Sequence, residues 1–374
     1  MTHQTLTSRP LRPKRKSQPK KMLALLIAAH DEELVIGQTI DSAIRAGMKP
    51  EHIYVVDDDS SDATSQIAKQ LLGSDNILRV WRSGKGLALT KATKKFELTN
   101  RYRWIHIADA DGGFAPNYFR VFRSRLRVKY VAATGYVRSL PGGAVSQYRV
   151  FEYTIGFEIH RRFQAMTRTI TIIPGPTSCF RADIFKNLNF ANGTLTEDFD
   201  VTLQIYRQKL GHIQYIPQAV AYTQDPKNLH DFIVQISRWN RGILQGVQRH
   251  KIGRRFSRLD AYLSFQILQN FLLFFGYFVV AVFFALKFRS IEIIAEIFLF
   301  DVWLTLLLTV LVVLRTRRWD ILSAFPHIYI FRWLSLLVFL KSFIEVVILG
   351  RFKANAADPL WSTAERRYRP VASA

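Results

Sequence analysis

The stretch that decides the fold reads IYVVDDDSSD and covers residues 53–62. It begins as a short apolar run and ends as a cluster of acidic and hydroxyl side chains. A second stretch, WIHIADADGG at residues 104–113, repeats this arrangement. A short apolar run indicates a buried β-strand, and a polar cluster directly after it marks where the strand ends. Both stretches therefore predict strands that carry polar groups at their carboxyl ends.

Further strands and helices alternate around these two stretches. Strands are predicted at residues 22–29 and 77–81, and helices at residues 34–44 and 63–72. Such alternation is typical of an α/β fold with a mostly parallel sheet covered by helices. Ligands bind sheets of this kind beyond the carboxyl ends of the strands. The acidic clusters therefore fall where a ligand site is expected.

Apolar residues dominate the last third of the chain. A bilayer-spanning helix needs about 20 residues. Three segments satisfy this length, at residues 263–286, 291–314 and 328–349. Asp301, in the second segment, is expected to face protein because a carboxylate in lipid is costly. Arg332, Lys341 and Glu345 leave the third segment open to a spanning, re-entrant or interfacial placement. Two or three transmembrane helices are therefore predicted, and the side of the C-terminus stays open.

The chain carries a formal net charge of +23, and its first 21 residues hold seven Lys or Arg and no acid. Nucleic-acid binding would explain this excess, but the sequence contains no nucleic-acid motif. Adhesion to anionic lipid, at about 1 kcal/mol per basic residue, agrees better with the apolar segments. Residues 1–21 are predicted to be a disordered basic tail, and residues 351–374 a second basic tail. Since residues 1–21 do not resemble a secretory signal, the domain that follows is expected in the cytoplasm.

Paired carboxylates are the first candidate site. Asp109 and Asp111 follow the apolar run at residues 104–108, with Gly112 and Gly113 behind them to let a ligand approach. Hard oxygen ligands suit Mg²⁺ or Mn²⁺, which commonly bridge one or two carboxylates and substrate phosphates. An isolated pair of this spacing is more often a solvated turn. Its position at the end of a strand favours a metal site.

Two further acidic clusters and one helical motif complete the set. Helix capping would not need three acids at residues 57–59, so a cation or a hydrogen-bonding ligand is expected to compensate them. Residues 196–198, Thr-Glu-Asp, form the third cluster. Gln235, Arg238 and Trp239 have the spacing of one helix face. Arg238 is predicted either to reach lipid headgroups or to pair with a diphosphate.

In this order, the motifs resemble the family-2 glycosyltransferases. They lie at residues 29–33 (AHDEE), 55–62 (VVDDDSSD), 109–112 (DADG), 196–198 (TED) and 235–239 (QISRW). The chain is similar in particular to the processive branch, which contains cellulose, chitin, hyaluronan and poly-N-acetylglucosamine synthases. The resemblance covers roughly residues 22–250 and continues into C-terminal membrane helices. Each motif is weak alone, whereas five in order are specific.

The resemblance implies a GT-A (Rossmann-like) domain that binds a nucleoside-diphosphate sugar, with a UDP-linked hexose or N-acetylhexosamine expected. This domain would cover residues 22–229 on the cytoplasmic side. Residues 230–260 would form an interfacial amphipathic region with the Gln-x-x-Arg-Trp motif, and residues 261–350 the transmembrane region. The protein would be an integral protein of the plasma or inner membrane.

The resemblance also implies roles for individual residues. Those expected to bind the donor are His30, Glu32, Asp57, Asp58, Lys85 and Asp109. Those expected to hold Mg²⁺ or Mn²⁺ are Asp111 and Asp109. The general base would be Asp198, and the residues that hold diphosphate and acceptor would be Gln235, Arg238 and Trp239. A single displacement would invert the anomeric carbon, so an α-linked donor would give a β-linkage.

Some features depart from the family pattern. Asp59 stands where the family commonly has Gly, and Asp31 replaces a frequent Asn. Two or three spans are few for a polysaccharide channel, and the gating-loop motif of bacterial cellulose synthases has no match.

The partners expected are a nucleotide sugar, a growing glycan or saccharide acceptor and the bilayer, without nucleic acid; homo-oligomerisation stays open.

Two other classes of function remain as alternatives. A polyprenyl-phosphate glycosyltransferase would share the acidic motifs, but such enzymes generally lack Gln-x-x-Arg-Trp. A non-enzymatic, basic membrane-adhesion protein would explain the charge and leave the acidic clusters unexplained. A dinucleotide-binding oxidoreductase is disfavoured because no G-x-G-x-x-G follows the first strand.

Overall fold

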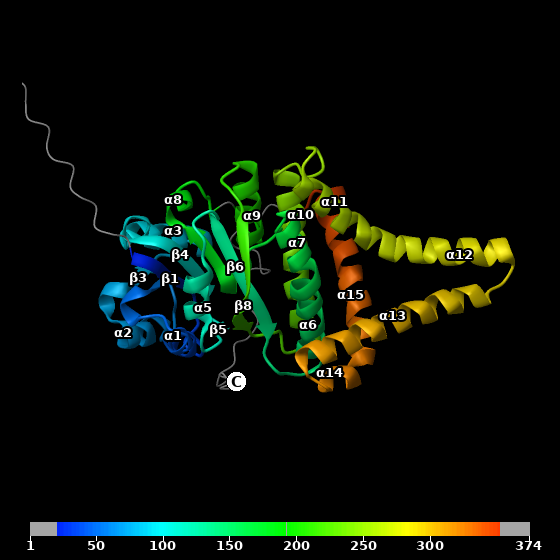
Figure 1. The fold of residues 1–374 in the computed structure, drawn as a ribbon, viewed down its shortest axis with the longest axis horizontal. Helices are drawn as coiled ribbons and strands as arrows, with labels where there is room; N and C mark the ends of the chain where they lie inside the picture. The colour runs from blue at the N-terminus through cyan, green and yellow to red at the C-terminus, as the bar shows by residue number, and fades with distance from the viewer. Residues whose placement is uncertain (1–20, 192, 352–374) are drawn as a thin grey trace, which may run out of the picture.

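The computed structural model describes residues 21–191 and 193–351. It has a central sheet surrounded by helices, and a helical hairpin projects from it (Figure 1). The tails predicted at residues 1–21 and 351–374 lie outside these ranges except for their innermost residues, Lys21 and Arg351. Strand β1 begins at Lys21, one residue before the predicted start.

Eight strands of the described chain form one sheet in the order β3-β2-β1-β4-β7-β6-β8-β5. Their bounds are β1 Lys21–Ala29, β2 Ile53–Asp58, β3 Ile77–Val80, β4 Tyr102–Asp109, β5 Gly113–Phe114, β6 Ala132–Ser139, β7 Ser178–Arg181 and β8 Ile213–Thr223. Strands β3, β2, β1 and β4 run parallel to one another, and so do β6 and β8. The other pairings are antiparallel. The prediction of a mostly parallel sheet is confirmed.

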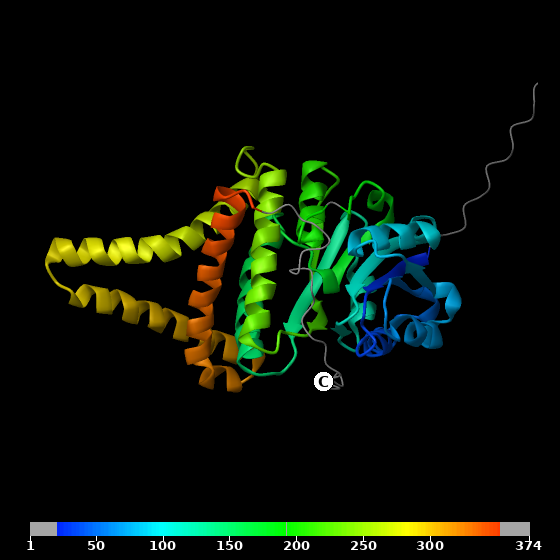
Figure 2. The ribbon, with the colours of Figure 1, turned by 180° about the vertical axis from the view of Figure 1, so that it is seen from behind.

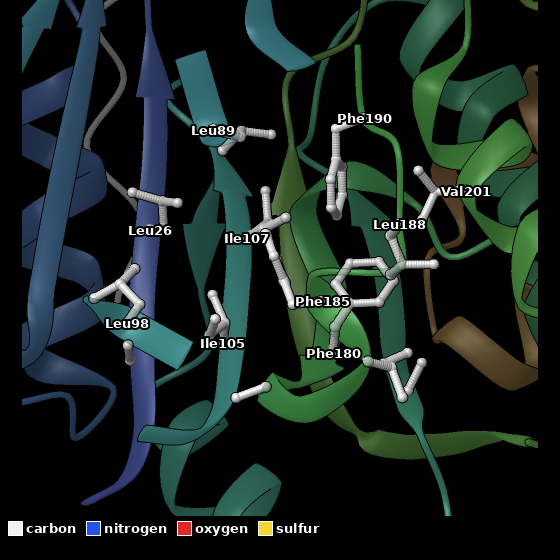
Figure 3. Close-up of a cluster of buried hydrophobic side chains, with 14 of the residues drawn as sticks. Leu26, Leu89, Leu98, Ile105, Ile107, Phe180, Phe185, Leu188, Phe190 and Val201 are labelled. Atoms are coloured by element: carbon white, nitrogen blue, oxygen red, sulfur yellow. The ribbon is translucent and has the colours of Figure 1, made fainter. Parts of the chain in front are cut away.

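Helices cover both faces of this sheet. They are α1 Ile36–Arg45, α2 Thr64–Leu72, α3 Lys85–Lys95, α4 Leu98–Arg101, α5 Tyr118–Arg125, α6 Ala144–Ile155, α7 Arg161–Thr167, α8 Ala182–Phe185 and α9 Glu197–Arg207. Leu25 and Ile27 of β1 belong to the core beneath α1, α2 and α5, whereas Leu26 belongs to the opposite core beneath α3, α4 and α8 (Figure 3). Successive side chains of a strand point to opposite faces, so β1 is apolar throughout.

The register of the sheet brings two acidic clusters to one edge. Ala29 of β1 is level with Asp57 of β2, and Ala28 is level with Asp109 of β4. Because these three neighbouring strands are parallel, their carboxyl ends meet at the same side of the sheet. The stretches at residues 53–62 and 104–113 thus deliver their polar residues to the place where a ligand site was expected.

The C-terminal third is helical. Its elements are α10 Leu229–Arg249, α11 Arg258–Phe271, η5 Leu272–Gly276, α12 Tyr277–Phe288, α13 Glu292–Thr316, α14 Asp320–Ser323, α15 Phe325–Phe343 and η6 Ile344–Ile348. Helices α12 and α13 form a hairpin that extends away from the sheet (Figures 1 and 2). Within the described part of the chain, two helical stretches are long and apolar enough to cross a membrane, Arg258–Phe288 and Glu292–Thr316. They correspond to the first two predicted segments.

The third apolar segment packs against the rest of the protein. Helix α15 lies against α10 and α6, where the Phe331 ring is 5.4 Å from Tyr148 and 5.1 Å from Phe232 between centroids. On α13, Asp301 accepts a hydrogen bond of 2.7 Å from Tyr329 and pairs with Arg332, both on α15. The expectation that Asp301 faces protein is confirmed. Helix α15 also covers the apolar side of α10, the helix predicted to be interfacial.

Replacement of Gly86 by Ala tests the packing of α3 against the loop before α9. A Cβ at Gly86 would lie 2.0 Å from the carbonyl oxygen of Phe190, which is backbone and has little room to move. We expect Gly86→Ala to destabilise the protein by about 1–3 kcal/mol, although Ala favours helices. Thermal unfolding of the purified chain measures the effect.

Gly156→Ala is the matched control for this experiment. Gly156 also has helical backbone angles, and nothing lies within 4 Å of the Cβ position. We expect this substitution to be neutral or to stabilise by up to about 1 kcal/mol. Equal melting temperatures for both variants would contradict the close packing at Gly86.

Candidate active site

Asp58 ties the end of β2 to the loop that precedes α3. Its carboxylate accepts hydrogen bonds from the backbone N–H groups of Ser83, at 2.6 Å, and Gly84, at 2.7 Å. The Nδ1 atom of His30 lies 2.8 Å from the carbonyl oxygen of Asp58. These contacts fix the start of α3, so the position of Lys85, its first residue, depends on Asp58. The donor-binding roles of these residues stay predictions.

Asp57 is fully buried and is compensated within the chain. Its carboxylate accepts a hydrogen bond of 2.9 Å from the backbone N–H of Ser60. Arg79 of β3, which is level with Asp57 in the sheet, places its guanidinium 3.8 Å from Asp57 and 3.5 Å from Asp59. A cation or a hydrogen-bonding ligand was expected to compensate the three consecutive acids. Arg79, which the sequence did not single out, compensates Asp57 and Asp59, and backbone N–H groups donate to Asp58.

The two departures from the family pattern share one backbone feature. Asp31 has φ 52° and Asp59 has φ 65°, both in the left-handed region. Gly adopts this region freely, and Asn and Asp tolerate it better than other residues do. Asp31 also accepts a hydrogen bond of 2.7 Å from the backbone N–H of Ser61, which links the two loops. Asp at these positions is thus compatible with turns where the family commonly has Gly or Asn.

Glu32 lies in the same pair of loops. Its side chain is buried, and its backbone N–H donates a hydrogen bond of 2.7 Å to the hydroxyl of Thr64 at the start of α2. Asp62 accepts hydrogen bonds from the backbone N–H groups of Thr64 and Glu33, both at 3.0 Å. Asp62 thus binds a backbone N–H in the first turn of α2. These bonds hold the end of β1 beside the end of β2.

Lys85 connects two of the acidic motifs. Its ammonium nitrogen lies 2.7 Å from a carboxylate oxygen of Asp109 and 2.6 Å from one of Glu197. Burial disfavours the charge on Lys85, but the two carboxylates outweigh burial and raise the pKa of the ammonium group. A single cation therefore links α3, the end of β4 and the start of α9. Glu197 was named only as part of its motif and received no role from the sequence.

Asp198 follows Glu197 in the first turn of α9. Its carboxylate accepts a hydrogen bond of 2.8 Å from the backbone N–H of Phe199. Burial, reinforced by the negative charge of Glu197, raises the pKa of Asp198 to about 7. A carboxylate with a pKa near the working pH can accept a proton effectively. The environment of Asp198 is thus suited to the general-base role that the resemblance implies.

Asp111 has a setting compatible with a metal held together with a substrate. It is partly exposed and lines a small cavity with Thr39, Gly112 and Tyr222. No group of three or more His, Cys, Asp or Glu side chains converges as a metal site among residues 21–191 and 193–351. Mg²⁺ is commonly held by one or two carboxylates plus substrate phosphates and therefore does not require such a group. The donor set fits Mg²⁺ or Mn²⁺.

Two of the three residues predicted on one face of α10 meet at a buried arginine. Arg149 of α6 donates a hydrogen bond of 2.6 Å to the side-chain oxygen of Gln235. Its guanidinium also lies 4.6 Å from the centre of a Trp239 ring. Arg238 is partly exposed, and the described residues give it no ion pair. Gln235 and Trp239 therefore share a side of α10, as their spacing predicts, and both contact Arg149, which the sequence did not indicate.

Helix α10 also reaches the start of α9. A Cβ at Gly242 would lie 2.4 Å from the hydroxyl oxygen of Thr196, so only Gly allows this approach. The side-chain oxygen of Gln245 accepts a hydrogen bond of 3.1 Å from the backbone N–H of Leu195. The helix that carries Gln235, Arg238 and Trp239 is therefore in direct contact with the loop that carries the Thr-Glu-Asp motif.

The sheet and its helices form a GT-A-like fold, and the family model below identifies the domain as a glycosyltransferase. The chain belongs to the family described as Glycosyltransferase like family 2, whose model matches residues 19–242. The resemblance to family-2 glycosyltransferases, which was based on the motifs, is therefore confirmed.

Two relatives and one solved structure illustrate the similarity. The chain is 26% identical over 238 residues to the probable glycosyltransferase YdaM of Bacillus subtilis (strain 168), covering 61% of this chain and 56% of YdaM. It is 25% identical over 249 residues to the hyaluronan synthase of Streptococcus pyogenes, covering 62% and 59%. The matched regions thus span less than three fifths of the length of these relatives. Similarity to a hyaluronan synthase agrees with the processive branch.

The structural comparison supports the fold. The mannosyltransferase PcManGT from Pyrobaculum calidifontis, in complex with GDP-Man and Mn²⁺, matches with a TM-score of 0.57 at 12% identity. The match covers 92% of both chains. At this identity it shows that the two proteins share a fold.

Lys85→Met tests the link between Asp109 and Glu197. Without the ammonium group the two carboxylates lose their shared donor, and hydrogen bonds to charged groups contribute about 1.5–3 kcal/mol each. We expect the variant to lose about this much stability and to melt at a lower temperature. Lys94→Met, at an exposed position of the same helix, should stay within about 0.5 kcal/mol. Unfolding of Lys85→Met at the wild-type temperature would show that the link is not stabilising.

Proposed function

We propose that the protein transfers a sugar from a nucleoside-diphosphate sugar to a growing glycan or another saccharide acceptor, with inversion at the anomeric carbon. The donor would be a UDP-linked hexose or N-acetylhexosamine, and an α-linked donor would give a β-linkage. The observation that supports this most is the contact of Lys85 with both Asp109 and Glu197. It joins the proposed metal- and donor-binding motif to the motif that contains the proposed base, Asp198.

Each of these residues has a place in the reaction. Asp198 would take the proton of the acceptor hydroxyl while that oxygen attacks the anomeric carbon. Negative charge grows on the departing diphosphate, and Arg238 would approach that charge from α10. Asp111, with Asp109, would hold Mg²⁺ or Mn²⁺, which would supply positive charge near the diphosphate oxygens. Lys85 would keep Asp109 in place and add positive charge on the donor side.

The same proposal includes attachment to a membrane. Helices α12 and α13 expose many large apolar side chains, including Val279, Phe283, Leu286 and Trp303. Exposed apolar surface of this extent is unfavourable in water and favourable in lipid. Both ends of the hairpin lie at the GT-A-like domain (Figure 2), so a hairpin that spans the bilayer would leave that domain on one side. A cytoplasmic placement would agree with Arg315 in the last turn of α13 and with Arg317 and Arg318 directly after it.

Sugar transfer can be tested directly with membranes that contain the overexpressed full chain. We expect one of a panel of radiolabelled nucleotide sugars to be incorporated when Mg²⁺ or Mn²⁺ is present, and EDTA to reduce incorporation at least tenfold. A water-soluble saccharide product would support the proposed acceptor. A product extracted into organic solvent would instead indicate a polyprenyl-phosphate acceptor. Absence of incorporation from every donor at wild-type expression would overturn the proposal.

Asp198→Asn tests the base and carries a defined pH dependence. Because the pKa of Asp198 is raised to about 7, the ionised base is depleted below that pH. We expect wild-type kcat/KM to fall about tenfold per pH unit below pH 7 and to level off above it. Asn cannot accept the proton, so transfer should fall at least 10²-fold while donor binding is retained.

Asp183→Asn provides the control, because Asp183 is exposed and pairs with Arg181 away from the motifs. It should leave the pH profile unchanged. The melting temperature of Asp198→Asn at pH 8 should equal or exceed that of the wild type, since burial disfavours the ionised carboxylate in the folded state. A flat wild-type profile from pH 6 to 8, or full turnover by Asp198→Asn, would exclude this residue as the base.

A further inference from the structure

Arg149 occupies an unusual position for a charged residue. It lies in the middle of α6 with 0% of its side chain exposed. One of its terminal nitrogens pairs with Glu152, and the other donates to Gln235. Its Nε atom is buried without a hydrogen-bond partner in the described part of the protein. Burial of a charge with an unsatisfied donor is costly, so packing alone would favour an apolar side chain here.

Two aromatic rings, those of Phe232 and Trp239, lie close to the guanidinium group of Arg149. The guanidinium carbon lies 4.6 Å from the centre of a Trp239 ring and 4.8 Å from that of Phe232. Both distances are within the range of about 6 Å in which a cation is attracted to an aromatic face. Phe232 is buried, and Trp239 is partly exposed. Arg149 therefore contacts a ring that is partly exposed and so accessible to a ligand.

Arg149 also determines how Gln235 is oriented. A guanidinium group carries only donors, so the atom of Gln235 that faces it must be the side-chain oxygen. The amide NH₂ group of Gln235 is then turned away from Arg149. That group can donate to oxygens of a diphosphate or a sugar, whereas the opposite orientation would present a second acceptor to them. One buried cation thus sets the direction of one motif residue and contacts the ring of another.

We propose that Arg149 is a positioning residue that holds Gln235 and Trp239 in the orientation needed for sugar transfer. This inference rests on the proposed function, since it is there that Gln235 and Trp239 bind diphosphate and acceptor. Helix α6 thereby becomes part of the site, although none of the five sequence motifs lies on it. Arg149 acts through the two residues of α10 and does not itself need to contact the substrate.

A spectroscopic test reads the position of Trp239 without relying on turnover. The chain contains seven Trp residues, and incorporation of 5-fluorotryptophan gives each a ¹⁹F NMR signal. Trp239→Phe identifies the signal of Trp239 in the detergent-solubilised full chain. We expect Arg149→Met to shift or broaden that signal and to leave the others in place. Arg149→Lys keeps the charge but loses the planar fork, and it should shift the same signal less.

Arg161→Met is the matched control. Arg161 is also buried, lies on α7 and has its guanidinium 5.4 Å from the centre of the Phe157 ring, but it contacts neither Gln235 nor Trp239. This variant should leave the Trp239 signal unchanged even if it lowers the melting temperature. Should Arg149→Met fail to fold, Arg149→Lys provides the comparison. A Trp239 signal that is unchanged in the Arg149 variants would overturn the inference.

Kinetics show whether the positioning matters for transfer. We expect Arg149→Met to lower kcat at least 30-fold while the KM for the nucleotide sugar changes less than threefold. Introduced into Trp239→Phe, the same substitution should cost less than a third of its effect in the wild type, because both changes disturb one unit. Independent, multiplicative effects would contradict the inference. Inactivity of the wild type would instead count against the proposed function, while the ¹⁹F comparison would still test the contact.

Discussion

The ion pair of Lys85 with Asp109 and Glu197 is the interaction on which the arrangement of the site depends. It joins three elements that are far apart in the chain. Without the ammonium group between them, the two negatively charged carboxylates would repel each other. The hydrogen bonds that the Asp58 carboxylate accepts from the loop before α3 set where α3 begins, and Lys85 is its first residue. A change in either contact would therefore move acidic groups on two different elements at once.

Around this centre the protein uses charge in two different ways. At the end of β2, Asp57 lies beside Arg79 and Asp58 accepts hydrogen bonds from backbone N–H groups, so both carboxylates hold neighbouring parts of the chain in place. At the start of α9, burial and Glu197 disfavour the charge of Asp198 and leave it ready to accept a proton. Acidic clusters that look alike in the sequence thus differ in their chemistry because their surroundings differ.

The helical part of the protein serves both the site and the membrane surface. Helix α10 contacts the Thr-Glu-Asp loop at Gly242 and contacts α6 through Arg149. Its other side is covered by α15, which in turn holds Asp301 of the projecting hairpin through Arg332. An unbroken series of packed helices therefore connects the proposed acceptor end of the site with the segments proposed to enter the bilayer.

The sequence by itself determined the first four of the eight described strands (β1 to β4), the mostly parallel sheet, the two long apolar helices and the family, because these depend on local apolar patterns and on motifs in a fixed order. It could not identify Arg79, Glu197 or Arg149 as partners, since nothing local distinguishes them from other charged residues. It also could not decide that the third apolar segment, α15, packs on α10. Those facts follow from which surfaces meet in three dimensions. Contacts between residues distant in the chain, such as Arg149 with Gln235, are set by packing of whole elements and leave no periodic signal.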